Sequence, residues 1–77
     1  MITTEHARAA MEEHGISEEE IKACIDHGEL IIKQFIKGEQ RYGKEIWLKN
    51  IKLVVIFTYE KEDIKIITCY PVRRKKW

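Results

Sequence analysis

The chain has 77 residues, of which 14 are basic and 13 acidic, for a formal net charge of +1. This length predicts a single domain over residues 1–77 and leaves no room for a second one. No apolar run approaches the roughly 20 residues of a membrane-spanning helix, so we expect no membrane partner.

The near-neutral total conceals a split in charge. Residues 1–29 hold eight acids and two bases, whereas residues 30–77 hold five acids and twelve bases. The break falls where the pattern changes from helix to strand, which predicts an acidic helical layer on a basic sheet layer. A basic sheet attracts phosphate, but it also balances the helices, and both interpretations stay open.

Glu5, His6 and Arg8 interrupt the window that a secretory signal would need to be apolar. We therefore expect a cytoplasmic protein with reduced thiols. Ile, Glu and Lys are abundant, a thermophile-like composition in which intracellular disulfides are less rare. A Cys24–Cys69 bridge therefore stays open as an alternative.

Neither the cysteines nor the histidines predict a metal site. Cys24 and Cys69 match no metal-ligand spacing. His6 and His14 are eight residues apart, which places them about 12 Å apart along a helix. We expect no metal and no cofactor.

Two helices are predicted at the start of the chain, over about residues 3–14 and 18–27. Thr3 or Thr4 can cap the first helix, and Gly15 fits the left-handed residue that ends it. Ser17 and Glu20 form a capping box for the second helix.

From residue 29 onward the period drops to two, which predicts strands over about residues 30–37, 41–48, 51–59 and 64–70. Short loops indicate an antiparallel sheet, and we expect Pro71 to end the last strand. The strand at 51–59 is apolar on both faces and should lie inside the sheet. The predicted fold class is α+β, with two N-terminal helices packed on a four-stranded antiparallel sheet and a basic tail at 71–77; a short extra strand at Ile2 stays open.

Several short segments carry a family resemblance: TTEHARAAMEEHGISEEEIKACIDHGE, RYG and ITCY. In this order and spacing they resemble the domain-of-unknown-function family numbered 4258, which is similar to the RelE-type toxins, bacterial and archaeal RNases. The resemblance implies a RelE-like fold whose uncovered sheet face is the working surface. It also implies RNA or the ribosome as target and an antitoxin-like protein as partner. Ala10 and His14 stand where the family usually has arginine.

Metal-independent RNA cleavage needs a base, an acid and a cation at one phosphate. The candidate catalytic residues are His6 as base, Arg41 as the phosphate ligand and Tyr70 as acid or stacking platform. The candidate RNA-binding residues are Arg8, Lys52, Thr68, Arg73 and Arg74.

Each candidate also has a structural interpretation. His6 can hydrogen-bond the sheet edge. Thr68 and Tyr70 share the strand face of Ile64 and Ile66 by simple alternation, which makes them residues of the core edge. The basic tail can be a frayed end.

The leading hypothesis is a RelE-like toxin-family protein that binds RNA and cleaves it without metal. The alternatives are a non-catalytic protein-interaction module, acting as a homodimer or with another protein, and a degenerate toxin that kept only the fold.

Overall fold

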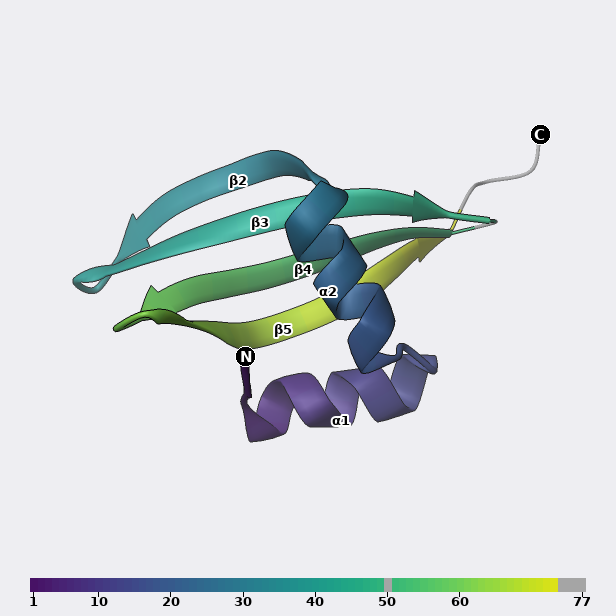
Figure 1. Ribbon diagram of the computed structural model, residues 1–77, viewed down its shortest axis with the longest axis horizontal. Helices are drawn as coiled ribbons and strands as arrows, with labels where there is room; N and C mark the ends of the chain where they lie inside the picture. Colours follow the sequence, from purple (N-terminus) through teal and green to yellow (C-terminus); the bar gives the residue numbers. More distant parts are fainter. Residues whose placement is uncertain (50, 74–77) are drawn as a thin grey trace.

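The computed structural model describes residues 1–49 and 51–73, and the candidate Arg74 lies outside them. Two helices pack on a five-stranded sheet (Figure 1). The elements in chain order are β1 (Ile2–Thr3), α1 (Glu5–His14), α2 (Glu18–His27), β2 (Glu29–Ile36), β3 (Glu39–Leu48), β4 (Ile51–Glu60) and β5 (Asp63–Arg73).

The sheet has the order β1-β5-β4-β3-β2, and β1 runs parallel to β5 while the other pairs are antiparallel. The α+β class is confirmed, but the prediction of four antiparallel strands is wrong because the sheet is mixed and has a fifth strand. Ile2 and Thr3 pair with Lys65 and Ile66 as the chain enters α1. The short extra strand at Ile2, which the sequence left open, is therefore present, although a strand of two residues is too short to show a period of two. As predicted, the apolar strand β4 is interior.

Capping residues set the helix boundaries. The hydroxyl of Thr4 accepts a hydrogen bond from the Ala7 amide (3.1 Å) and donates one to the Ile66 carbonyl (2.9 Å). Ser17 and Glu20 form both arms of the capping box. α2 crosses β3 and β4 while α1 lies along β5 (Figure 1). The Lys44 ammonium on β3 donates to the Ile25 carbonyl (2.6 Å), which ties the last turn of α2 to the sheet.

The prediction that Pro71 ends the last strand is wrong, because β5 continues to Arg73. Pro71 lies opposite Leu53 of β4, whereas β1 pairs only with Lys65 and Ile66. The outer side of β5 is therefore a free edge at Pro71, where a residue without an N–H is tolerated.

A bulge in β5 decides which side chains reach the helix-free face, here called the open face. Phe57 pairs with Ile66 but Ile56 pairs with Thr68, which leaves Ile67 as an extra residue. Beyond the bulge the alternation is reversed, so Cys69 joins Ile66 under the helices. Thr68 and Tyr70 lie on the open face, and their placement on the face of Ile64 and Ile66 was wrong.

The core lies between the helices and the sheet. Its members are Ala7, Ile16, Ile21, Cys24, Ile25, Leu53, Val55, Phe57, Ile66 and Cys69. Both cysteines are free thiols, not a disulfide. Burial raises the pKa of the Cys24 thiol to about 11 and also raises the pKa of the Cys69 thiol. Reactive thiolate is therefore scarce at both positions.

We expect both thiols to react slowly with a maleimide in the native protein, roughly 100-fold or more slower than in denaturant, since reaction requires opening of a core worth about 3–5 kcal/mol. Mass spectrometry of quenched samples measures the rates. The variants Cys24→Ser and Cys69→Ser, with one thiol each, assign them. A native thiol that reacts at the rate of the unfolded chain would contradict this picture.

Candidate nucleic-acid interface

Two large aromatic side chains and a lysine lie together on the open face. Trp47 of β3 is directly opposite Lys52 of β4, and Lys52 is opposite Val72 of β5. One row further along, Tyr70 is opposite Val54. Trp47 is 53% exposed and Tyr70 40%, while Val54 beneath them is only 2% exposed. We call Trp47, Lys52, Tyr70 and Val72 the Trp47 patch.

Lys52 connects the aromatic and ionic parts of the patch. Its Nζ lies 5.2 Å from the Trp47 ring centroid and 3.3 Å from a carboxylate oxygen of Glu45. The ring and the carboxylate together hold the ammonium in place. The side chain is therefore preorganised beside a flat aromatic surface.

A groove next to Trp47 opens on the helix side of this end of the sheet, since Glu20 belongs to α2 and Leu48 and Ile51 are helix-side residues. It has a volume of about 550 Å³ and is lined by Glu20, Trp47, Leu48, Lys49 and Ile51. β2 begins opposite Glu45, so Trp47 and Leu48 have no β2 residue beside them. This end of the sheet therefore offers an aromatic ring, an apolar groove and the two lysines at positions 49 and 52.

Of the predicted RNA-binding residues, the fold places Lys52 and Thr68 on the open face of adjacent strands. Arg73 ends β5 opposite Ile51, on the helix side of the sheet. Arg8 is exposed on α1 and does not join them. Trp47 was not among the predicted RNA-binding residues. The strand alternation, which places Trp47 on the same face as Arg41, was the sequence signal that could have identified it.

Arg41 belongs to a separate ion-pair network. Its Nε donates to Glu39 (2.9 Å), and Lys65 lies 3.7 Å from Glu39 and 3.4 Å from Glu60. The hydrogen bond from Arg41 lowers the pKa of the Glu39 carboxyl, and the charge of Lys65 adds to the effect. The Arg41 guanidinium is thus already bound by a carboxylate.

The three predicted catalytic residues are not brought together. Arg41 and Lys65 contact the same carboxylate, Glu39, and Lys65 pairs with Thr58 of β4. Tyr70 pairs with Val54, which is four residues away from Thr58 along β4. That offset is about 13 Å along the strands. His6 is exposed in the first turn of α1. Helix α1 packs along β5, near the β1 edge of the sheet, and β4 separates β5 from β3, which carries Arg41. Within the described residues, no hydrogen bond or ion pair joins any two of the three.

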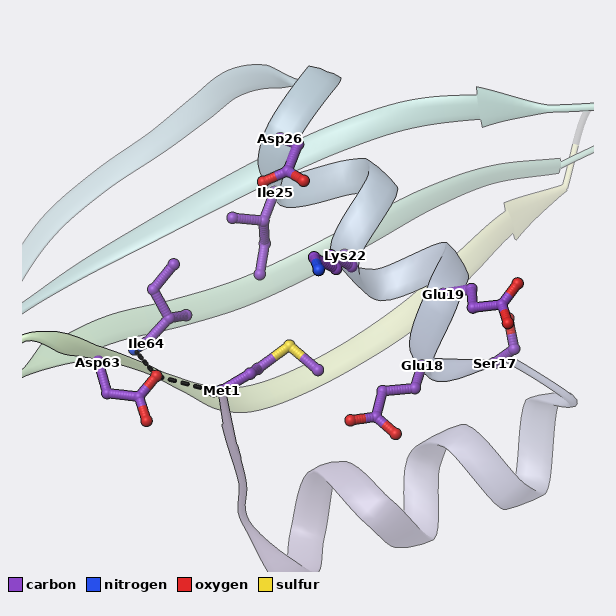
Figure 2. A pocket seen from close by; sticks show the side chains of 9 residues that line it. All are labelled: Met1, Ser17, Glu18, Glu19, Lys22, Ile25, Asp26, Asp63 and Ile64. Atoms are coloured by element: carbon purple, nitrogen blue, oxygen red, sulfur yellow. Dashed lines mark hydrogen bonds and ion pairs between the residues drawn. The ribbon is translucent and has the colours of Figure 1, made fainter.

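The helix side carries a groove of opposite character (Figure 2). It has a volume of about 610 Å³ and is lined by Met1, Ser17, Glu18, Glu19, Lys22, Ile25, Asp26, Asp63 and Ile64. The amino group of Met1 and the amide of Ile64 both contact Asp63 Oδ1 at 2.8 Å, and these contacts lower the pKa of the Asp63 carboxyl. Four carboxylates against two cations make this groove unfavourable for phosphate.

Across residues 1–49 and 51–73, no group of three or more His, Cys, Asp or Glu side chains is arranged to hold a metal ion. Helices long and apolar enough to cross a membrane are likewise absent from those residues.

Arg41→Met should raise the pKa of the Glu39 carboxyl, because it removes the hydrogen bond that favours the ionised form. NMR titration of the side-chain carboxyl carbons measures the change. Lys22→Met, which removes a cation on α2, is the control and should leave Glu39 unchanged. An unchanged Glu39 pKa in Arg41→Met would show that Arg41 is not bound by this carboxylate.

Comparison with known proteins gives one result. A family model described as Domain of unknown function (DUF4258) matches residues 3–71. No curated protein and no solved structure matches the chain. Since the model spans most of the 77 residues, the resemblance to this family is confirmed, and the chain belongs to the DUF4258 family.

Proposed function

We propose that this chain is an RNA-binding relative of the RelE-type toxins that binds single-stranded RNA on its open face, at the Trp47 patch. The observation that carries the proposal is the exposed Trp47 ring on β3 with the Lys52 ammonium against it, and a second exposed ring, Tyr70, two strands across on β5 and one row along. Exposed rings next to cations are the usual means of holding unpaired bases and their phosphates.

The chemistry of the patch suits single strands better than duplexes. Stacking of an unpaired base on an aromatic side chain is worth about 1–3 kcal/mol. Trp47 and Tyr70 offer two such rings, and Lys49 and Lys52 supply charge beside them. A paired base cannot present its flat surface to either ring, so the proposed ligand is unpaired RNA.

Electrostatics also favour this end of the open face. The helix-side groove at Asp63 is acidic, and the Arg41 network includes two carboxylates, Glu39 and Glu60. Within residues 1–49 and 51–73, Glu45 is the carboxylate paired with Lys52, and Glu20 is a second carboxylate in the groove next to Trp47. The Lys52–Glu45 pair is partly buried, with side-chain exposures of 26% for Lys52 and 19% for Glu45, and a phosphate that displaces Glu45 gives Lys52 an anionic partner in its place.

The proposal is restricted to binding and does not include cleavage. Cleavage requires a base, an acid and a cation around one phosphate, and His6, Arg41 and Tyr70 lie on three separate parts of the fold. The variant His6→Ala should therefore bind RNA as the wild type does.

Trp47→Ala or Tyr70→Ala should each weaken binding of a fluorescein-labelled oligouridine by roughly 5- to 150-fold, which corresponds to the loss of one stacked base. Lys52→Gln should weaken binding and reduce its salt dependence, because one phosphate contact is lost. Fluorescence anisotropy titrations at two salt concentrations measure both effects.

Two matched variants serve as controls. Tyr59 is an exposed tyrosine on the helix-side register of β4, and Lys61 is an exposed lysine in the β4–β5 turn. Tyr59→Ala and Lys61→Gln should bind RNA normally. Equal losses in Tyr59→Ala and Tyr70→Ala, or no RNA binding by the wild type, would refute the proposal and favour a protein ligand for the patch.

A further inference from the structure

The edge strand β2 exposes an unusual amount of apolar surface. Phe35 is 71% exposed and Leu30 50%, and Ile31 and Ile36 are exposed as well. Within the described residues β2 pairs only with β3, and it forms the sheet edge away from α1 (Figure 1). Natural edge strands are normally short, charged or covered, because their free backbone groups attract other strands.

The outer part of β2 has the geometry of a strand ready to pair. The irregularity lies at Ile31, between Leu30 and Ile32, and pairing with β3 is regular from Ile32 to Ile36. Lys33 is the only charged residue between Glu29 and Lys37. An uninterrupted, largely uncharged stretch of five residues thus offers its outer backbone groups.

The pairing with β3 fixes which side each residue of this stretch occupies. Lys33 is opposite Tyr42, which stacks on the core residue Phe57, so Lys33 and Phe35 lie on the helix side. Ile32 is opposite Gly43 and packs against it on the open face, together with Gln34 and Ile36 in alternation.

We propose that two copies of this chain associate through β2, antiparallel, with Gln34 of one copy opposite Gln34 of the other. Ile32 then lies opposite Ile36 on the open face, and Lys33 opposite Phe35 on the helix side. The two sheets form one continuous sheet around a two-fold axis perpendicular to it. The apolar residues of β2 gain cross-strand neighbours on both faces.

Charge selects this register over its neighbours. A shift by one residue would place open-face residues against helix-side residues and is excluded by the alternation. A shift by two in one direction places Lys33 opposite Lys33, and in the other direction places Lys33 opposite Lys37. Like charges directly opposite each other destabilise a strand pair, and only the Gln34-centred register avoids them without using the irregular Ile31.

A charge exchange at Phe35 tests the interface. Phe35→Lys places lysine opposite Lys33 of the second copy, whereas Phe35→Glu places a carboxylate there, and both remove the same ring. Sedimentation equilibrium over a range of concentrations should show the wild type and Phe35→Glu rising from 9.2 kDa toward twice that mass. Phe35→Lys should stay at 9.2 kDa. Ile2→Lys, at the opposite edge, should behave as the wild type.

Crosslinking tests the register. With oxidised glutathione, Gln34→Cys should form a disulfide between copies, because residues directly opposite each other lie within reach of a disulfide. Phe35→Cys should not, since its two copies are offset by two residues along each strand. The native cysteines are buried and do not interfere.

A wild type that stays at 9.2 kDa throughout overturns the proposal. The proposal is also overturned if the Phe35→Lys and Phe35→Glu variants dissociate into monomers to the same extent. It is likewise overturned if Phe35→Cys forms the disulfide between copies and Gln34→Cys does not. This inference is independent of RNA binding at a single patch, because the Phe35→Lys monomer keeps the Trp47 patch and should bind an oligouridine too short to reach two patches with wild-type affinity.

Discussion

The β5 bulge at Ile67 is the constraint on which the open face depends. Ile66 and Cys69 are both essentially inaccessible to solvent, yet residues three apart on a regular strand point to opposite faces. One extra residue resolves the conflict and turns Thr68 and Tyr70 away from the helices. The Thr4 hydroxyl lies 2.9 Å from the Ile66 carbonyl and 3.3 Å from the Ile67 carbonyl, so the cap of α1 also holds the bulge. Core packing on one face thus sets the side chains available for binding on the other.

Within residues 30–49 and 51–73, the basic charge is not spread over the open face. Its cations at Arg41, Lys52 and Lys65 are each paired with a carboxylate. The remaining positive charge includes the hairpin turns, where Lys37, Lys49 and Lys61 all have positive φ. Non-glycine residues adopt this conformation at a cost and are found there mainly in tight turns. The split in charge therefore reflects turn chemistry as well as the sheet. These turns lie at both ends of the sheet, with Lys49 beside the Trp47 patch and Lys37 and Lys61 beside the Arg41 network.

How far the sequence could predict this structure depended on how local each feature is. The capping box at Ser17 and the apolar β4 follow from residues next to one another, and both were predictable. The two-residue β1 and the bulge depend on contacts between distant segments. The three-residue spacing of Ile66 and Cys69 indicates a bulge only when both side chains are known to be buried on the same face. For the site, Lys52 could be identified as a cation on a strand, but its Glu45 partner and the Trp47 ring lie on another strand and required the register. The separation of His6 from Arg41 also follows only from the strand order.

The two proposals become connected through the symmetry of the sheet. A two-fold axis perpendicular to a continuous sheet keeps both open faces on the same side. Two Trp47 patches would then share one surface, with the apolar residues Ile32 and Ile36 of both copies between them. Once an RNA strand long enough to reach both patches is bound at one of them, binding at the second patch takes place within the same complex. The length of the nucleotides between the two contacts sets the effective RNA concentration at that second patch. Pairing of β2 would in this way convert two small binding surfaces into one extended surface, without any further contact between protein and RNA.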